Sequence, residues 1–431
     1  MPIILRLAEA YELDVRSLSG AQEDRSLAGL NEVFSDALFR DLTVNKQELR
    51  DAAQLCPSIA DAIHRLYGAY IKARHGEETL ALERLAERDD PAAGHRPNPI
   101  ERVRAFLETS RNHFPEIDAL AERLHAELGA APDQMFSALS ERMRERHGIR
   151  ARVMPVEVMP ESLRRYHPHR HQLLISELLS PSGRIFQIGF QLGVIEASPA
   201  IEKLVRQSGE TEPATQKLLR ITLANYFAAA VMMPYGRFFE AAETLGYDIA
   251  VLSQRFGASF EQVCHRLTTM QRPTARGVPF FMIRVDNAGN VSKRLSSGGF
   301  HFSRYGGTCP LWNIHSTFKV PNQVFVQIVE MPEGTRYFSI ARTVRRASMP
   351  FAQAEAQFAI GLGCEIKHAD RLVYSRGLNI QTPHPTPIGI NCRLCERANC
   401  SQRAEPPASR PLLVDETTHG ISPFGFAAES P

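Results

Sequence analysis

The sequence predicts an α+β protein, with a helical N-terminal and middle region followed by a β-rich C-terminal domain. From residue 26 to about residue 275, apolar residues recur mainly at helical spacing, and the Pro-, Gly- and charge-rich stretch 87–99 is typical of a linker. From residue 278 onward, runs such as 278–285, 323–329 and 337–344 are rich in branched and aromatic residues, as strands are. Between the first run and Val291, Asn287-Ala-Gly-Asn290 predicts a hairpin turn.

The 431-residue chain has room for two to three domains, and its elements predict five segments. Residues 172–179 interrupt the middle helical block as either a short strand or a helical turn. The predicted segments are a terminal helix at 1–20, a helical linker region at 21–90, the larger helical block at 99–275, a β-rich and cysteine-rich domain at 276–410 and a flexible tail at 411–431.

Composition limits the class of protein. Hydrophobic content of 43% and charged content of 23% are ordinary for a soluble globular protein. The sequence has neither an apolar run long enough to span a bilayer nor a secretory signal, so we expect a cytoplasmic protein without a membrane partner. A net charge of +2 is too small to indicate nucleic-acid binding by itself.

Five of the seven cysteines lie in the last third of the chain, and three form the motif Cys392-x-x-Cys395-x4-Cys400. In a reducing compartment such a cluster favours metal ligation, and an all-sulfur site favours zinc or an iron–sulfur cluster. The fourth ligand must come from elsewhere. We expect Cys309, which precedes a proline and lies near the only tryptophan, with Cys364 as the alternative. The other two cysteines lie in apolar helical stripes, where a free cysteine is more often a buried hydrophobe.

A basic, glycine-rich segment follows the first predicted strand. Cations on neighbouring strands beside glycine turns suit a phosphate-bearing small molecule, but a solvated hairpin face explains the pattern equally well. The candidate ligand-binding residues are Arg284, Lys293, Arg294, His301 and Arg304.

The segments 184–194 and 223–234 resemble the two helices that carry the zinc site of ImmA/IrrE-type metallopeptidases. On this resemblance the histidine positions fall on Phe190 and Val194, the catalytic glutamate on Gln191 and the third ligand on Leu223. None of these side chains can activate a zinc-bound water, so we expect a degenerate peptidase domain without catalytic residues. Residues 248–267 predict a helix-turn-helix, whose apolar second helix favours scaffold packing over DNA reading.

Longer motifs make the chain resemble the short-chain fatty acyl transcriptional regulators, which include propionate and methylcitrate-cycle regulators. The resemblance rests on residues 264–267, 271–280, 306–312 and 361–365 and on the cysteine trio. It implies an Xre-type helix-turn-helix at the N-terminus, a degenerate peptidase-like middle and a C-terminal domain that senses acyl-coenzyme A. One branch of the family is understood to hold an iron–sulfur cluster, so the resemblance selects [4Fe-4S] held by Cys309, Cys392, Cys395 and Cys400, with zinc as the alternative.

The expected function is therefore ligand-sensing transcriptional regulation of short-chain fatty acyl metabolism by a homo-oligomer, and not an enzymatic activity. Pro2–Tyr11 match only the last helices of an Xre domain, so residues 1–20 are expected to be its remnant. We therefore expect that this chain alone does not bind promoter DNA specifically. The alternatives are an interaction partner of an intact paralogue and a residual enzyme.

Overall fold

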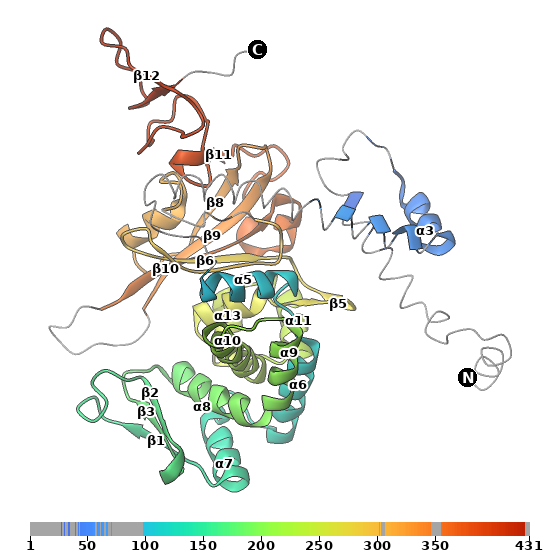
Figure 1. Ribbon diagram of the computed structural model, residues 1–431, viewed down its shortest axis with the longest axis vertical. Coiled ribbons are helices and arrows are strands. Elements are labelled where there is room, and N and C mark those ends of the chain that lie inside the picture. Colours follow the sequence, from blue (N-terminus) through green and yellow to red (C-terminus); the bar gives the residue numbers. More distant parts are fainter. Residues whose placement is uncertain are drawn as a thin grey trace. The chain divides into compact units, whose positions relative to one another are not determined.

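The computed structural model describes residues 98–300, 302, 307–345 and 355–426, together with scattered positions between residues 27 and 70. The chain divides into two compact units, residues 1–95 and 96–431 (Figure 1). The predicted boundary near residue 275 falls inside the second unit. The predicted Xre remnant at 1–20 lies outside the described residues.

In the first unit, α3 (Lys46–Leu55) begins at a capping box. The Asn45 side chain accepts hydrogen bonds from the backbone N–H groups of Gln47 and Glu48, and the Glu48 carboxylate accepts one from the Asn45 N–H at 2.8 Å. This exchange satisfies donors that a helix start would otherwise leave unpaired. A small apolar cluster that includes Leu49 accompanies this helix.

The helical part of the second unit is built around α10 (Pro213–Met232), which is buried on all sides from Tyr226 to Met232. A helix that is apolar all round must be covered by other helices. Those in contact with it are α5 (Pro99–Thr109), α6 (Pro115–Leu128), α8 (Pro181–Glu196), α9 (Ser198–Gln207) and α13 (Phe260–Leu267). The remaining helices of this part are α7 (Met135–His147), α11 (Tyr235–Thr244) and α12 (Ile249–Phe256). No described helix is both long and apolar enough to cross a membrane.

A three-stranded sheet beside α7 and α8 was only partly predicted. Residues 172–176 form its central strand β3 (Gln172–Ser176), which settles the strand-or-turn alternative in favour of a strand. Its partners β1 (Arg150–Met154), parallel to it, and β2 (Arg164–His167), antiparallel to it, lie in the block expected to be helical. Both outer strands are short and contain no fully buried residue, so they lack the apolar alternation that reveals a strand in sequence.

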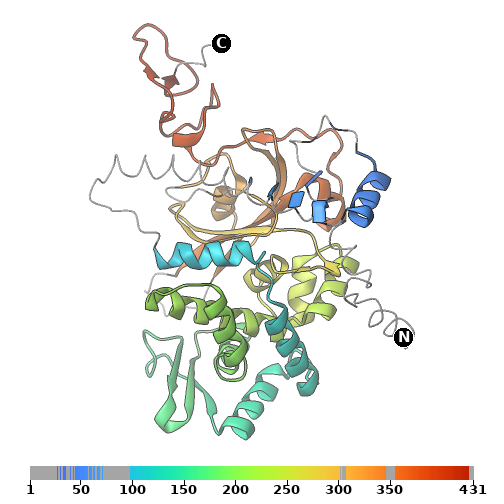
Figure 2. The same ribbon diagram turned by 45° about the vertical axis from the view of Figure 1, so that its right-hand side comes forward.

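The C-terminal part contains a six-stranded sheet in the order β11-β8-β9-β10-β6-β7, which confirms the α+β prediction. Figure 2 shows the yellow and orange strands of this part next to the green and cyan helices. All neighbouring strands are antiparallel except the β11–β8 pair. Asp286 closes the predicted hairpin by accepting hydrogen bonds from the N–H groups of Ala288 and Asn290. The strands are β6 (Phe281–Asp286), β7 (Val291–Ser296), β8 (Phe325–Glu330), β9 (Arg336–Arg345), β10 (Gln357–Glu365) and β11 (Thr386–Pro387). The other short strands are β4 (Gln271–Arg272), β5 (Ala275–Arg276), β12 (Leu412–Leu413) and β13 (Gly425–Phe426).

The two faces of this sheet belong to two different cores. Because side chains alternate along a strand, Cys364 and Leu362 of β10 join the helical core, whereas Ala359 joins a separate cluster on the opposite face. That second cluster is aromatic, and in it Phe281 stacks on Phe300 with ring centroids 4.0 Å apart. The sheet is therefore buried on both sides.

A buried ion pair fastens the helical part. The Arg266 side chain of α13, which is 0% exposed, donates from Nη2 to Asp118 Oδ1 of α6 at 2.7 Å. Tyr226 of α10 donates its hydroxyl to the other carboxylate oxygen at 2.7 Å, and His113 Nε2 lies 3.3 Å from that oxygen. Arg266 also donates to the Met233 carbonyl at 3.0 Å. Since these groups come from α6, α10 and α13, the cluster fixes three helices against one another.

Candidate functional site

The cysteine-rich loop is held in place by two arginines that the sequence did not single out. Arg403 is 4% exposed, and its guanidinium donates to the carbonyl oxygens of Cys392 at 3.2 Å and Arg397 at 2.6 Å. Arg397 in turn donates to the carbonyl oxygens of Ile388 at 3.2 Å and Glu330 at 2.9 Å. Arg403 therefore links two backbone segments of the loop, and Arg397 links the loop to β8.

Within this loop Cys392–Leu394 form a 3-10 turn that Asn391 caps, its side chain accepting from the Leu394 N–H at 3.0 Å. Cys395 follows the turn and is 8% exposed. A Cβ atom on Gly389 would lie 2.7 Å from the Cys395 sulfur, closer than side-chain carbons approach. Only glycine lets the backbone pass the thiol here, which explains a glycine just before the cysteine motif.

Cys309 lies beside this loop although it is more than eighty residues away in sequence. Burial raises the pKa of the Cys309 thiol, hydrogen bonds from the backbone N–H groups of Gly389 and Leu311 lower it, and the neighbouring Cys395 and Cys392 raise it. The Cys309 thiol therefore lies close enough to Cys392 and Cys395 for these two expected ligands to affect its pKa. All seven cysteines of the chain are free thiols.

Cys364, the alternative fourth ligand, lies on the other face of the sheet. It is fully buried in the helical core, where desolvation raises the pKa of its thiol. Cys309 belongs instead to the aromatic cluster on the face nearer the cysteine loop. Among the residues described by the structure, no three His, Cys, Asp or Glu side chains converge tightly enough to hold a metal ion. The four-cysteine site thus remains a prediction with suitable donor chemistry.

Trp312, the only tryptophan, lies within the aromatic cluster. Its indole N–H donates to the Ser339 hydroxyl at 2.9 Å, and its backbone N–H donates to the Cys309 carbonyl at 3.0 Å. The side chain is 2% exposed and packs near Phe281 and Phe300. Trp312 therefore anchors the segment that carries Cys309 to the sheet.

The basic residues that the sequence suggested for ligand binding take part in ion pairs with the helices. Arg284 of β6 lies 2.9 Å from Glu261 of α13, and Lys293 of β7 lies 3.5 Å from the same carboxylate oxygen. Arg294 of β7, which is 8% exposed, lies 3.6 Å from Glu101 of α5. These contacts join the sheet to the helical part. Ligand binding by these residues is therefore still a prediction.

The rest of the basic segment comprises two further candidate ligand-binding residues and its glycines. His301 and Arg304 lie outside the described residues. At Gly298 a Cβ atom would lie 2.3 Å from the Pro279 carbonyl oxygen, so this glycine permits a close approach of the chain to its own backbone. The glycine pair is thereby explained in part by local folding.

At the peptidase-like positions, α8 and α10 pack closely. A Cβ atom on Gly193 would lie 2.9 Å from the Phe227 ring, so glycine is needed where the helices meet. Phe190 and Gln191 are 6% and 5% exposed, and Leu223 is fully buried. The Arg164 guanidinium of β2 lies 3.8 Å from the Phe190 ring centroid. An arginine–aromatic contact therefore occupies the position where the resemblance placed a zinc ligand.

The helix-turn-helix predicted at 248–267 is present as α12 and α13 joined at Gly257, which has a φ of 59°. Its second helix is buried through Phe260, Val263 and Leu267. Because a recognition helix must present side chains to a groove, this pair serves as scaffold.

Comparison with known proteins agrees with this two-part architecture. Residues 144–268 match the family model of the IrrE N-terminal-like domain, and residues 269–424 match that of the short-chain fatty acyl coenzyme A regulator, C-terminal. The HTH-type transcriptional regulator PrpR of Mycobacterium tuberculosis is 37% identical over 100% of this chain and 88% of its own length. The chain belongs to the short-chain fatty acyl-coenzyme A regulator family.

Other members of the family show the same extent of similarity. The HTH-type transcriptional regulator RamB of M. tuberculosis is 38% identical over 98% of this chain and 89% of its own length. The propionyl-CoA carboxylase regulator of Cereibacter sphaeroides is 36% identical over 98% of this chain and 88% of its own length. A solved structure of a M. tuberculosis transcriptional regulator superposes with a TM-score of 0.73 at 41% identity, covering 76% of this chain and 99% of that one. These relatives are named as regulators and none as an enzyme, which confirms the prediction of a non-enzyme.

Proposed function

We propose that this chain is a transcriptional regulator of short-chain acyl metabolism that responds to a short-chain acyl-coenzyme A. The observation that carries the proposal is the family match over 269–424, whose name specifies a short-chain fatty acyl coenzyme A regulator. The named relatives include a propionyl-CoA carboxylase regulator, which points to the same metabolism. In this proposal the sheet domain senses the effector, and a homo-oligomer acts on promoter DNA. This revises the expectation that the chain alone does not bind promoter DNA, because its relatives are named as HTH-type transcriptional regulators.

The ion pairs between sheet and helices offer a route from effector to output. An acyl-CoA phosphate that reached Arg284 and Lys293 would compete with Glu261 for the same cations, because phosphate and carboxylate both pair with guanidinium and ammonium groups. Binding would then loosen α13 from the sheet. A ligand changes a conformational equilibrium only through contacts that differ between its states, and this exchange of anions supplies such a difference.

This part of the proposal is tested by calorimetry with propionyl-CoA, butyryl-CoA and free coenzyme A on the full chain. Glu261→Gln removes the competing carboxylate and is expected to tighten binding, whereas Arg284→Gln is expected to weaken it by about ten-fold. A matched control is Glu116→Gln, which breaks the half-exposed pair between Glu116 of α6 and Lys203 of α9. Absence of heat with all three ligands would refute acyl-CoA sensing. If the affinity is unchanged in both Glu261→Gln and Arg284→Gln, the ligand binds at a different site.

We further propose that Cys309, Cys392, Cys395 and Cys400 hold a [4Fe-4S] cluster, with zinc as the alternative. Two observations support the site: the four cysteines are free thiols, and Cys309 lies close to Cys392 and Cys395. Thiolate sulfur is also the donor that both zinc and iron–sulfur clusters prefer. When bound, a cluster would supply redox or oxygen sensitivity, and zinc would supply structural cross-linking.

Anaerobic purification followed by absorbance and metal analysis tests the centre. Cys309→Ser is expected to lose bound metal as fully as Cys395→Ser does, whereas Cys364→Ser, on the other face of the sheet, retains it. Metal retention in Cys309→Ser with loss in Cys364→Ser would reassign the fourth ligand. A colourless protein with one zinc per chain would reject the cluster, and a metal-free protein would reject the centre.

A further inference from the structure

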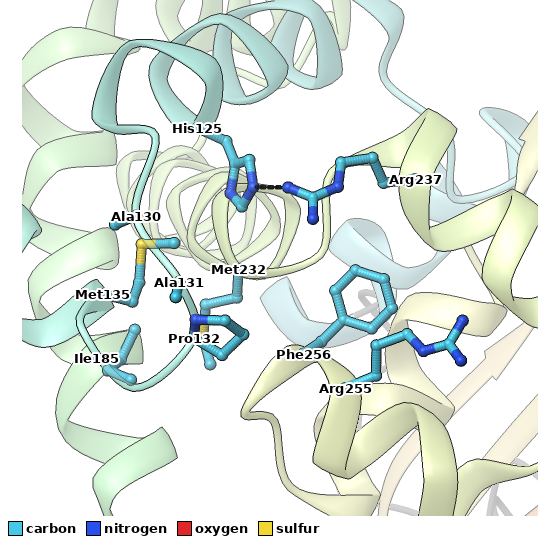
Figure 3. A pocket seen from close by; sticks show the side chains of 10 residues that line it. All are labelled: His125, Ala130, Ala131, Pro132, Met135, Ile185, Met232, Arg237, Arg255 and Phe256. Carbon is cyan, nitrogen blue, oxygen red and sulfur yellow. Dashed lines mark hydrogen bonds between the residues drawn. The ribbon is translucent and has the colours of Figure 1, made fainter.

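The helical part contains a small cavity that neither the regulator family nor the peptidase-like motif accounts for. Its volume is about 170 Å³, and it lies where the C-terminal end of α10 meets the loop between α6 and α7 (Figure 3). An apolar cavity of about 150 Å³ is large enough to admit benzene. The space therefore suits a ligand of roughly six or seven heavy atoms and excludes a peptide or a nucleotide.

One part of the wall is apolar, and the rest is polar. Met135 of α7, Ile185 of α8, Met232 of α10 and Phe256 of α12 line the apolar part, together with Pro132. Methionine side chains adapt their shape to what they enclose, so such a wall accepts an aliphatic chain without demanding one geometry. No Asp or Glu is present among the described residues that line the cavity.

The polar end of the cavity is formed by His125 and Arg237. His125 Nδ1 lies 2.9 Å from the Val231 carbonyl oxygen, which can only accept, so Nδ1 carries the proton. Nε2 is then an acceptor, and it receives a hydrogen bond from Arg237 Nη1 at 2.9 Å, as the dashed line in Figure 3 marks. Burial lowers the pKa of His125, the Val231 contact raises it and the charge of Arg237 lowers it. The imidazole is thus neutral and orients the guanidinium.

The Arg237 guanidinium has N–H donors that no described residue uses. One guanidinium nitrogen is used on His125, and no described carboxylate forms an ion pair with Arg237. Arg255 also lines the cavity, beside the Phe256 ring in Figure 3, and it likewise has no ion-pair partner among the described acidic residues. Arg237 and the neutral His125, which have no carboxylate partner among the described residues and lie in one cavity with Met232 and Phe256, match a ligand with one negative charge and an aliphatic body.

We propose that this cavity binds a free short aliphatic monocarboxylate, with its carboxylate on Arg237 and its chain against Met232 and Phe256. This site is separate from the one proposed for acyl-coenzyme A, and neither proposal depends on the other. The carboxylate is the distinguishing chemistry, because an acyl thioester has no carboxylate to offer to Arg237.

Pentanoate is the probe, titrated into the full chain by calorimetry and followed in parallel by saturation-transfer NMR. We expect saturable binding of pentanoate and none of pentanamide, which has the same shape without the charge. Arg237→Gln is expected to weaken binding about ten-fold or more. Glutamine retains a donor for His125, and residue 237 is solvent-exposed, so the fold is preserved. Arg123→Gln, an exposed position on α6 outside the cavity lining, is the matched control and should leave the affinity unchanged.

Three results would overturn the proposal: no saturable binding of pentanoate, equal binding of pentanamide, or an unchanged affinity in Arg237→Gln. A competition experiment tests whether the free carboxylate and the acyl-coenzyme A bind at separate sites. Pentanoate affinity is expected to be the same with and without saturating propionyl-CoA. Displacement of pentanoate by propionyl-CoA would place both ligands at one site and refute a separate carboxylate site.

Discussion

Replacing Asp118 by asparagine should destabilise this protein far more than breaking an exposed ion pair on the same helix. The substitution keeps the size of the side chain but removes the carboxylate that, among the described residues, pairs with Arg266, whose side chain is 0% exposed. Removing one partner of a buried pair costs about 3–5 kcal/mol, because the other charge stays buried without compensation. Lys203→Gln, which breaks the half-exposed pair with Glu116, should cost about 1 kcal/mol or less.

The size of the effect can be checked against the ionisation of Asp118. Burial raises the pKa of this carboxyl, but Arg266, His113 and Tyr226 lower it by more, and the balance brings it from 3.8 to about 2. This difference corresponds to about 2 kcal/mol of stability by linkage. The figure is smaller than the cost of Asp118→Asn because protonation leaves the hydrogen-bonding carboxyl group in place.

The pH dependence has a definite sign. Because the folded-state pKa is depressed, the contribution is fully present above about pH 4 and is lost as the pH falls toward 2. Wild-type protein should therefore lose stability over that interval, and Asp118→Asn should lack this component.

Urea unfolding followed by circular dichroism, at pH 7 and at steps down to pH 3, measures all three proteins. The double variant Asp118→Asn/Arg266→Met is a further control, since removing both charges should recover part of the loss. If Asp118→Asn unfolded within 1 kcal/mol of wild type, or no more easily than Lys203→Gln, the assigned role of the buried pair would be refuted.

Three further predictions concern close contacts and the peptidase-like helices. Gly363→Ala would place a Cβ atom 2.3 Å from the Phe281 ring, so we expect the free energy of unfolding, measured by thermal unfolding, to fall by about 3 kcal/mol or more. Gly236→Ala is the control and should be nearly neutral, because the nearest atom to its Cβ would be 3.7 Å away. Gly389→Ala should push the Cys395 thiol outward and speed its reaction with a thiol reagent in metal-free protein; an unchanged rate would contradict the close approach. Purified protein incubated with denatured casein and zinc should show no chelator-sensitive proteolysis, because the peptidase ligand positions carry no metal-binding side chain.

The sequence predicted those features that depend on local pattern. The strands near 278–285, 323–329 and 337–344 appear as β6, β8 and β9 because branched and aromatic residues alternate along them. The hairpin at 287–290 follows from its Asn and Gly residues. The cysteine trio is likewise visible in sequence, since its members lie within one loop.

The tertiary structure decided whatever depends on partners far apart in the chain. Arg284, Lys293 and Arg294 read as free cations in sequence because Glu261 and Glu101 approach them only after the sheet docks on α5 and α13. The outer strands of the small sheet were missed because their conformation is fixed by pairing with β3 rather than by their own residues.

The same distinction separates the candidate ligands of the cysteine site. Spacing left Cys309 and Cys364 as alternatives, but the two lie on opposite faces of one sheet, in different cores. The face a side chain takes depends on strand register, which tertiary pairing sets. Arg266 illustrates the limit most clearly: in sequence it is one more basic residue of a short helix, and only the burial of Asp118 against it makes it the centre of the helical part. Local sequence pattern thus determined which helices and strands form. Strand register and charge pairing between distant residues determined which side chains meet in the folded protein.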